Sequence, residues 1–83
     1  MLFHRELRKG DQGEDVKFLQ RLLFGVHAAV PGMAADGVFG DYTHHALVRA
    51  QEALKLPVTG AFDKATRAVF KSIYSFDFDA VPE

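Results

Sequence analysis

The sequence contains no cysteine. No disulfide can therefore stabilise the fold, and no thiolate can ligate a metal or attack a substrate. Long apolar runs are also missing, because none approaches the roughly 20 residues that a helix needs to cross a bilayer. The charged first stretch, MLFHRELRKGDQGED, lacks the apolar core of a signal peptide. These absences predict a domain that depends on its hydrophobic core and has no membrane partner.

Neither sign of charge is in excess. The sequence has ten Lys and Arg residues and eleven Asp and Glu residues, which gives a formal net charge of −1. Proteins that bind nucleic acid usually present a basic face, so we expect no nucleic-acid partner. An HExxH pair, a nucleophile elbow and a Cys–His pair are all missing. We therefore expect a non-enzymatic protein without a cofactor.

The histidines give no metal-site pattern. His44 and His45 are adjacent in the sequence, so on a helix they point about 100° apart and cannot chelate one ion as an i, i+4 pair does. As a candidate catalytic pair, the acids Asp36 and Asp41 flank a turn, but two neighbouring acids on a surface are common and do not indicate an enzyme. We expect no metal site, and histidines that face solvent or pack at a helix end.

The 83 residues suffice for one domain. Apolar side chains at helical spacing predict three helices, over about 11–24, 41–54 and 63–74. Asp11 and Glu14 resemble a capping box for the first helix, and Asp63 is a good N-cap for the third. In the third helix we expect Val69, Phe70 and Ile73 to face inward. Leu2, Phe3 and Leu7 are candidate core anchors before the first helix.

The chain repeats itself. Four residues of the first helix return 31 positions later in the second: Val16, Leu19, Gln20 and Leu23 as Leu47, Ala50, Gln51 and Leu54. Three residues before the second helix return 23 positions later before the third: Gly37, Phe39 and Thr43 as Gly60, Phe62 and Thr66. The offset of 31 exceeds the offset of 23 by eight, so the first loop, residues 25–35, holds eight extra residues. Neither half could bury its apolar face alone, so the halves should pack together.

The repeated Gly-x-Phe turn predicts its own geometry. Gly37 and Gly60 should supply a positive φ or a close backbone approach that a Cβ would block. Phe39 and Phe62 should then point inward, and each contributes about 1.5–3 kcal/mol if it is fully buried. Gly40 and the third-helix cap Asp63 take equivalent positions at the helix starts.

The repeated polar residues predict buried hydrogen bonds. Gln20 and Gln51 lie on otherwise apolar helix faces, where an amide costs stability unless it finds partners. We expect each amide to hold the backbone of the loop after its own helix. Thr43 and Thr66 should place their hydroxyls on free backbone donors at the helix starts.

The sequence thus predicts an all-α, three-helix bundle with an internal pseudo-repeat. Residues 1–10 form a lead-in, residues 11–74 the three-helix domain, and residues 75–83 a C-terminal tail of alternating aromatic and acidic residues. That tail is either a short strand packed on the bundle or a mobile arm.

Three segments together resemble the peptidoglycan-binding domain of the first type, a small three-helix module attached to many bacterial and phage cell-wall hydrolases. They are LRKGDQGEDVKFLQRLL, ADGVFGDYTHHAL and LPVTGAFDKATRAVF, and the resemblance covers about residues 7–70. Two positions depart from the pattern: Ala50 stands where an aromatic is frequent, and Lys55 where Gly is frequent. The resemblance implies a non-catalytic module that binds the glycan and stem peptides of the cell wall.

The resemblance also implies a shallow groove near the start of the second helix. By motif position it assigns the groove to Asp36, Gly37, Phe39, Gly40 and Thr43. Asp41 and Tyr42 fit the same role, since a carboxylate can bond hydroxyls and an exposed ring can stack on a sugar. The alternative is that Gly37, Phe39 and Gly40 only build the turn. That alternative does not explain Tyr42, whose repeat partner is Ala65.

Two further places could contribute to binding. Lys64, Arg67 and Lys71 form a cationic stripe on the third helix, which is either a solvated face or an attraction for stem-peptide carboxylates and wall polyanions. The first loop contains His27 within an apolar stretch, and it either binds ligand or covers the end of the bundle.

The leading function is peptidoglycan binding that targets or anchors a partner hydrolase or a phage or secreted assembly. The alternative is a protein–protein adaptor with the same fold and no glycan ligand. In the first case the protein acts at the cell wall, in the periplasm or outside the cell. Without a signal peptide, we expect it to be made in the cytoplasm and released or delivered, or to be part of a longer chain.

Overall fold

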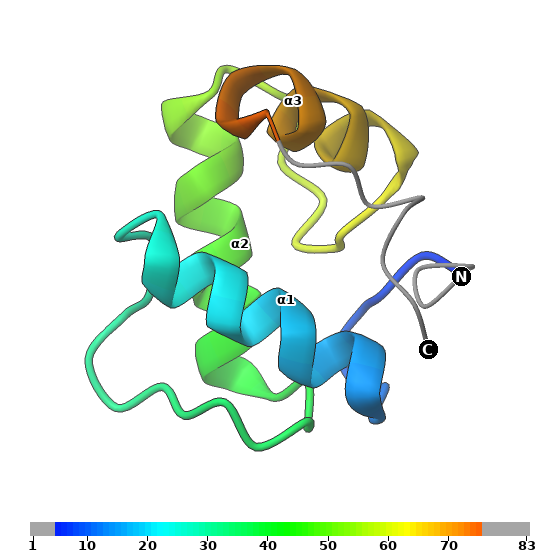
Figure 1. Cartoon of the computed structure of the whole chain (residues 1–83), viewed down its shortest axis with the longest axis vertical. Coiled ribbons are helices and arrows are strands. Elements are labelled where there is room, and N and C mark those ends of the chain that lie inside the picture. The colour runs from blue at the N-terminus through cyan, green and yellow to red at the C-terminus, as the bar shows by residue number, and fades with distance from the viewer. Residues whose placement is uncertain (1–4, 76–83) are drawn as a thin grey trace.

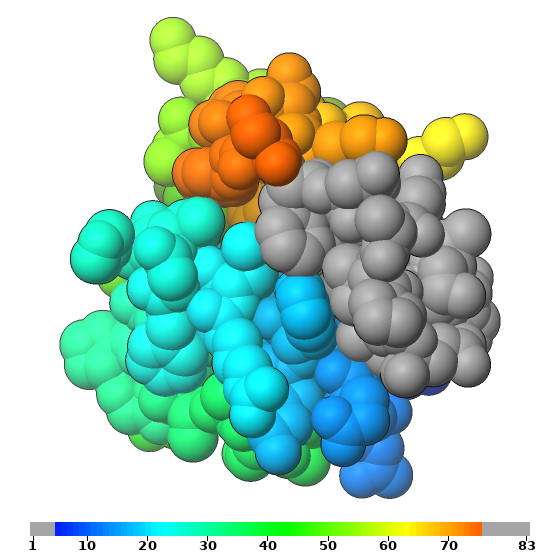
Figure 2. All heavy atoms as spheres, in the orientation of Figure 1, coloured from blue at the N-terminus to red at the C-terminus, as the bar shows by residue number. Residues whose placement is uncertain are grey.

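In a computed structural model, residues 5–75 are described, and they form three α-helices. The helices are α1 (Glu14–Gly25), α2 (Asp41–Ala53) and α3 (Lys64–Tyr74). Figure 1 shows α1 crossing α2, with α3 near the C-terminal end of α2. In the space-filling view, α1 and the loop after it cover most of α2 (Figure 2). The predicted all-α, three-helix fold is confirmed.

One core cluster joins all three helices. Its buried apolar residues are Leu7, Val16, Leu19, Leu23, Met33, Phe39, Ala46, Leu47, Ala50, Phe62 and Phe70. The rings of Phe39 and Phe62 are 1% and 2% exposed, as the repeat predicted. Phe62 meets Phe70 edge to face, with ring centroids 5.7 Å apart, an arrangement that aromatic pairs prefer. Met33 belongs to the first loop, so that loop covers one end of the core.

Gln20 holds the turn that precedes α2. Its Oε1 accepts the Gly37 N–H at 2.8 Å, and its Nε2 donates to the Val38 carbonyl at 2.9 Å. The same Nε2 lies 2.9 Å from the Thr43 hydroxyl. Because the Gln20 side chain is only 1% exposed, these hydrogen bonds satisfy polar groups that water cannot reach.

Gln51 repeats this network before α3. Its Oε1 accepts the Gly60 N–H at 2.9 Å, and its Nε2 donates to the Ala61 carbonyl at 2.9 Å and to the Thr66 hydroxyl at 2.8 Å. The prediction that each glutamine holds the loop after its own helix is confirmed. The prediction for the hydroxyls is wrong: the Thr43 and Thr66 hydroxyls accept from the side-chain amides of Gln20 and Gln51.

We call residues 36–40 the first corner and residues 59–63 the second corner. Gly37 and Gly60 have φ of 80° and 73°, which confirms the predicted left-handed backbone. At the second corner Asp63 caps α3 by accepting the Thr66 N–H at 2.9 Å. At the first corner Gly40 is the N-cap of α2 and offers no side-chain cap.

The start of α1 and the end of α3 differ from the sequence predictions. The N-cap of α1 is Gly13, with φ of 143°, and not Asp11. Asp11 instead accepts the Arg8 N–H at 2.9 Å, because the Gly13 N–H bonds the Gly37 carbonyl and fixes the helix start two residues later. In α3 the predicted inward side chain of Ile73 is 54% exposed.

The segment before α1 is bonded to both corners. Leu7 exchanges backbone hydrogen bonds with Phe62, at 3.2 and 2.7 Å. The Gly10 N–H donates to the Phe39 carbonyl, and the Phe39 N–H donates to the Asp11 carbonyl, each at 2.9 Å. Leu7 is fully buried and is the predicted core anchor. The other two candidates, Leu2 and Phe3, and tail residues 76–83 lie outside the described residues.

A bidentate ion pair fastens the same segment to α1. Arg5 Nε lies 2.9 Å from Asp15 Oδ2, and its terminal nitrogen lies 3.2 Å from Oδ1. Burial alone would raise the pKa of Asp15, but the hydrogen bonds from Arg5 and the Val16 N–H, with the Arg5 charge, hold this pKa below its usual value. Asp15 is therefore a buried carboxylate that the N-terminal segment keeps ionised.

Candidate functional site

A hollow of about 220 Å³ lies beside the first corner; we call it the Tyr42 hollow. Its lining residues are Gln20, Gly32, Met33, Ala34, Asp36, Val38, Gly40, Asp41, Tyr42 and Thr43. Tyr42 is 56% exposed, and the covered part of its ring lies over Gly32, where a Cβ would come within 3.0 Å of Cζ. The first loop thus positions a solvent-accessible aromatic ring at the start of α2.

The structure separates the seven predicted site residues into two groups. Gly37, Phe39 and Thr43 are buried, and the corner uses them for its turn, its core contact and its hydrogen bond to Gln20. Asp36, Asp41 and Tyr42 are exposed, with Gly40 half-buried among them. The structure therefore brings Asp36, Gly40, Asp41 and Tyr42 together at one accessible surface.

The two carboxylates of this surface remain charged to low pH. The Val38 N–H and the Gln20 amide bond the Asp36 carboxylate and lower its pKa. The ion pair with Lys9 lowers the pKa of Asp41. Asp36 has no cation partner within residues 5–75, so its charge is available to a ligand.

A second hollow, of about 320 Å³, lies on the α1 side of the same corner; we call it the Lys17 hollow. Its lining residues are Gln12, Gly13, Glu14, Lys17, Asp36, Gly37 and Val38. This hollow was not predicted from the sequence. Its signal was present in the repeat, because Lys17 stands 31 positions before Val48 and places a charge where the second copy has an apolar residue.

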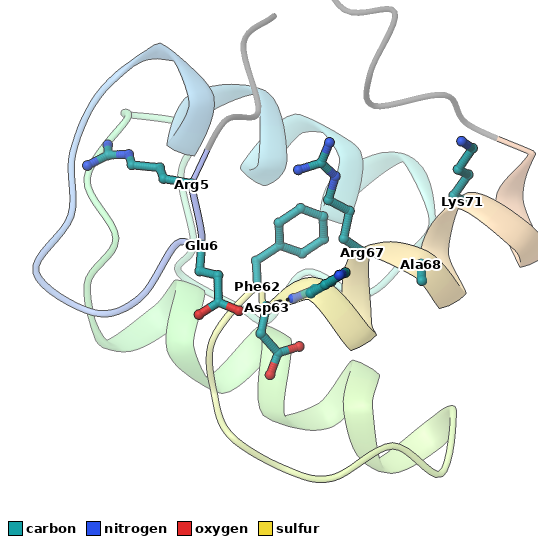
Figure 3. A pocket seen from close by; sticks show the side chains of 8 residues that line it. Arg5, Glu6, Phe62, Asp63, Arg67, Ala68 and Lys71 are labelled. Atoms are coloured by element: carbon teal, nitrogen blue, oxygen red, sulfur yellow. Dashed lines mark hydrogen bonds between the residues drawn. The ribbon is translucent and has the colours of Figure 1, made fainter.

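The predicted secondary residues Lys64 and Arg67 line a third hollow, of about 520 Å³, on α3 (Figure 3). Its residues are Arg5, Glu6, Phe62, Asp63, Lys64, Arg67, Ala68 and Lys71. Both carboxylates are engaged with the start of α3: Glu6 accepts the Lys64 N–H at 3.2 Å, and Asp63 accepts the Thr66 N–H. Figure 3 shows Arg67 and Lys71 extending to the same side of α3.

His27 lies apart from both corners. It is exposed, has φ of 60°, and lines a hollow of about 190 Å³ together with Arg49 and Tyr74. Across residues 5–75, no three side chains of the His, Cys, Asp and Glu types lie close enough to hold a metal ion. In the same range no helix has the length and apolar character needed to span a membrane.

Comparison with known proteins identifies relatives of this fold. A family model described as "Putative peptidoglycan binding domain" matches residues 12–70. This range contains α1, α2, both corners and most of α3. The resemblance noted from the sequence is thereby confirmed.

Two of the similar solved structures show how far the likeness extends. The crystal structure of the SleB N-terminal domain superposes with a TM-score of 0.74 at 34% identity, covering 82% of this chain and 90% of that chain. A peptidoglycan-binding protein from Clostridioides difficile, solved in complex with glutamine hydroxamate, gives a TM-score of 0.70 at 31% identity, covering 78% of this chain and 39% of that chain.

A curated relative is much longer than the region it shares. The "Probable N-acetylmuramoyl-L-alanine amidase" of Bacillus licheniformis is 37% identical over 60 residues, which is 72% of this chain. The chain spans only 17% of that relative's length. The shared region is thus a small part of the amidase.

Proposed function

This chain belongs to the family of peptidoglycan-binding domains, and we propose that it binds cell-wall peptidoglycan without catalysing a reaction on it. The observation that carries the proposal is the family match over residues 12–70, which includes the entire first corner and its exposed surface. The absence of catalytic motifs in the sequence supports a binding role.

The ligand binds in the Tyr42 hollow. The exposed face of the Tyr42 ring stacks on a sugar, and its hydroxyl stays in water. The Asp36 and Asp41 carboxylates accept hydrogen bonds from sugar hydroxyls and amides. Phe39 is no part of this contact surface, because its side chain is buried and does not line the hollow. Thr43 lines the hollow, but its hydroxyl is buried and accepts a hydrogen bond from Gln20.

The backbone N–H groups at the start of α2 supply hydrogen-bond donors for the ligand. Gly40 gives α2 no side-chain cap, so first-turn N–H groups remain open to an acetamido carbonyl or a carboxylate. The start of α3 is different, because Asp63 and Glu6 already accept its N–H groups. This difference favours the first corner over the second as the ligand site.

The domain serves to hold an attached or associated hydrolase, or a larger assembly, at the cell wall. The amidase relative, which shares only a small region with this chain, supports this arrangement. Weak contacts that repeat along a polymer raise the local concentration of the attached protein far above that of free protein.

Co-sedimentation with purified sacculi tests the function. We expect the protein to pellet with sacculi at low and at moderate salt, and the Tyr42→Ala variant to pellet less. A wild-type protein that stays in the supernatant at both salt concentrations would contradict peptidoglycan binding and favour the adaptor alternative. Turbidity of the same suspension should stay constant, since a fall caused by the protein alone would indicate hydrolysis.

A further inference from the structure

The Tyr42 hollow and the Lys17 hollow are neighbours at the first corner and share part of their lining. Asp36 and Val38 line both hollows. Val38 is 49% exposed, and we call Asp36 and Val38, which the two hollows share, the crest of the first corner. A ligand that leaves the Tyr42 ring along this crest therefore reaches α1.

The second corner differs from the first on the side of the Lys17 hollow. Gly13, the N-cap of α1, lies against Gly37, and His44, 31 positions later in α2, lies against Gly60. The imidazole of His44 fills the space beside Gly60, whereas the space beside Gly37 meets the Gly13 backbone and the Cβ of Lys17. Both corners have a glutamine that bonds the glycine N–H and the threonine hydroxyl, so this shared network does not require the Lys17 hollow.

The side chains of the Lys17 hollow carry charges of both signs. Glu14 and Lys17 are three residues apart on α1, yet they form no ion pair with each other. In the described part of the chain, neither side chain has an ion-pair partner or a side-chain hydrogen bond. Asp36 adds a second carboxylate at the crest. One cation beside two carboxylates fits a group with both charges and disfavours a polyanion.

We propose that the Lys17 hollow binds the zwitterionic end of an uncross-linked stem peptide, while the Tyr42 hollow holds the sugar. Lys17 pairs with a carboxylate of the terminal diamino acid, and Glu14 pairs with its free ammonium group. A cross-link converts that amine to a neutral amide, so the domain distinguishes uncross-linked from cross-linked wall. This inference rests on the proposed function, because it assigns the second half of the same ligand.

A pair of muropeptides tests the inference with the full chain. The first probe is a disaccharide tripeptide that ends in a diamino acid with a free amine, and the second is the same compound N-acetylated at that amine. Calorimetric titration should show about tenfold weaker binding of the acetylated probe, the loss expected for one partly desolvated ion pair.

Variants assign the effect to residues. Glu14→Gln should bind both probes with equal affinity, and Lys17→Gln should weaken binding of both. Glu52→Gln, an exposed glutamate on α2 that lines none of the described hollows, is the matched control and should keep the wild-type ratio.

The two possible failures are distinguishable. If wild-type protein binds sacculi and binds both probes with equal affinity, the inference is overturned and peptidoglycan binding stands. If it binds neither the probes nor sacculi, the proposed function fails. A tenfold preference that Glu14→Gln retains would also overturn the assignment of the ammonium group to this hollow.

Discussion

The imidazole of His44 packs against the bare α-carbon of Gly60, and a Cβ built on Gly60 would lie 2.6 Å from its Nδ1. The equivalent contact in the first copy is between Gly13 and Gly37, where the nearest atom to such a Cβ is the Gly13 carbonyl oxygen at 3.2 Å. A side chain therefore covers the glycine of the second corner, whereas mainly backbone covers the glycine of the first. We propose that this difference favours the first corner as the ligand site.

Gly60→Ala should destabilise the domain by about 1–3 kcal/mol, because the substitution forces a left-handed backbone on alanine and also displaces His44. Urea unfolding measures the change. Gly25→Ala is the control, since nothing lies within 4 Å of a Cβ at this last residue of α1. The double variant His44→Ala, Gly60→Ala should recover the part of the loss that comes from the clash. Equal midpoints for Gly60→Ala and Gly25→Ala would contradict the close contact.

Gln51→Leu should cost about 2–5 kcal/mol of unfolding free energy, because it leaves the buried Gly60 N–H and Thr66 hydroxyl without the Gln51 amide and removes one partner of the Ala61 carbonyl. Thermal or urea unfolding gives the value. Gln12→Leu replaces an exposed amide that makes no side-chain hydrogen bond in the described residues, and it should change stability little. If the two variants are equally stable, the buried network does not hold the second corner.

Acid should unfold the protein through carboxylates whose pKa lies below its ordinary value of 3.8: Asp15, Asp36, Asp41 and Asp63. The unfolded chain takes up protons near that ordinary value, whereas the folded protein takes them up only at lower pH. Their stabilisation is therefore complete above pH 3.8 and is lost as pH falls from there through the lowered values of the folded state.

Unfolding free energies measured by urea titration at several pH values check this dependence. Asp15→Asn should be less stable than wild type at pH 7 and should lose less stability on acidification, because the ionised partner of Arg5 is gone. Glu52→Gln, on the exposed face of α2, should match wild type at pH 7. Stability that is flat down to pH 2 would rule out the contribution of these carboxylates.

Tyr42→Ala should weaken binding to sacculi by about tenfold, which is the loss expected for one aromatic contact. Because the ring is 56% exposed, the unfolding free energy should stay within about 0.5 kcal/mol of the wild-type value. Tyr42→Phe should keep most of the affinity, since the ring face makes the contact. Val58→Ala removes another exposed apolar side chain and is the control. Binding isotherms on sacculi that coincide for Tyr42→Ala and Val58→Ala would remove the ring from the site.

Most of the features that could be predicted from the sequence follow from the internal repeat. Two offsets identified the glutamine networks and the buried rings of Phe39 and Phe62, because these features depend on residues close in sequence or related by the duplication. The first residues of the helices were harder to predict from the sequence. Asp11 had the chemistry of a cap, but a backbone bond between Gly13 and Gly37, distant in sequence, fixed the start of α1 instead.

The candidate site was predictable in part. Motif position led to Asp36, and side-chain chemistry led to Asp41 and Tyr42. Motif position also led to Phe39, although the repeated turn predicted that its ring points inward. The Lys17 hollow and the Arg5–Asp15 ion pair depend on how the segment before α1 lies against the corners. No periodicity in the chain encodes that placement, so these features required the structure.

Mapping of backbone amide shifts during titration with a disaccharide tripeptide is the most direct test of the difference between the two corners. We expect shifts at Lys17, Asp36, Val38 and Tyr42, and none at Thr59, Ala61 or Lys64. Shifts concentrated at the second corner, or spread equally over both corners, would contradict the assignment of ligand binding to the first.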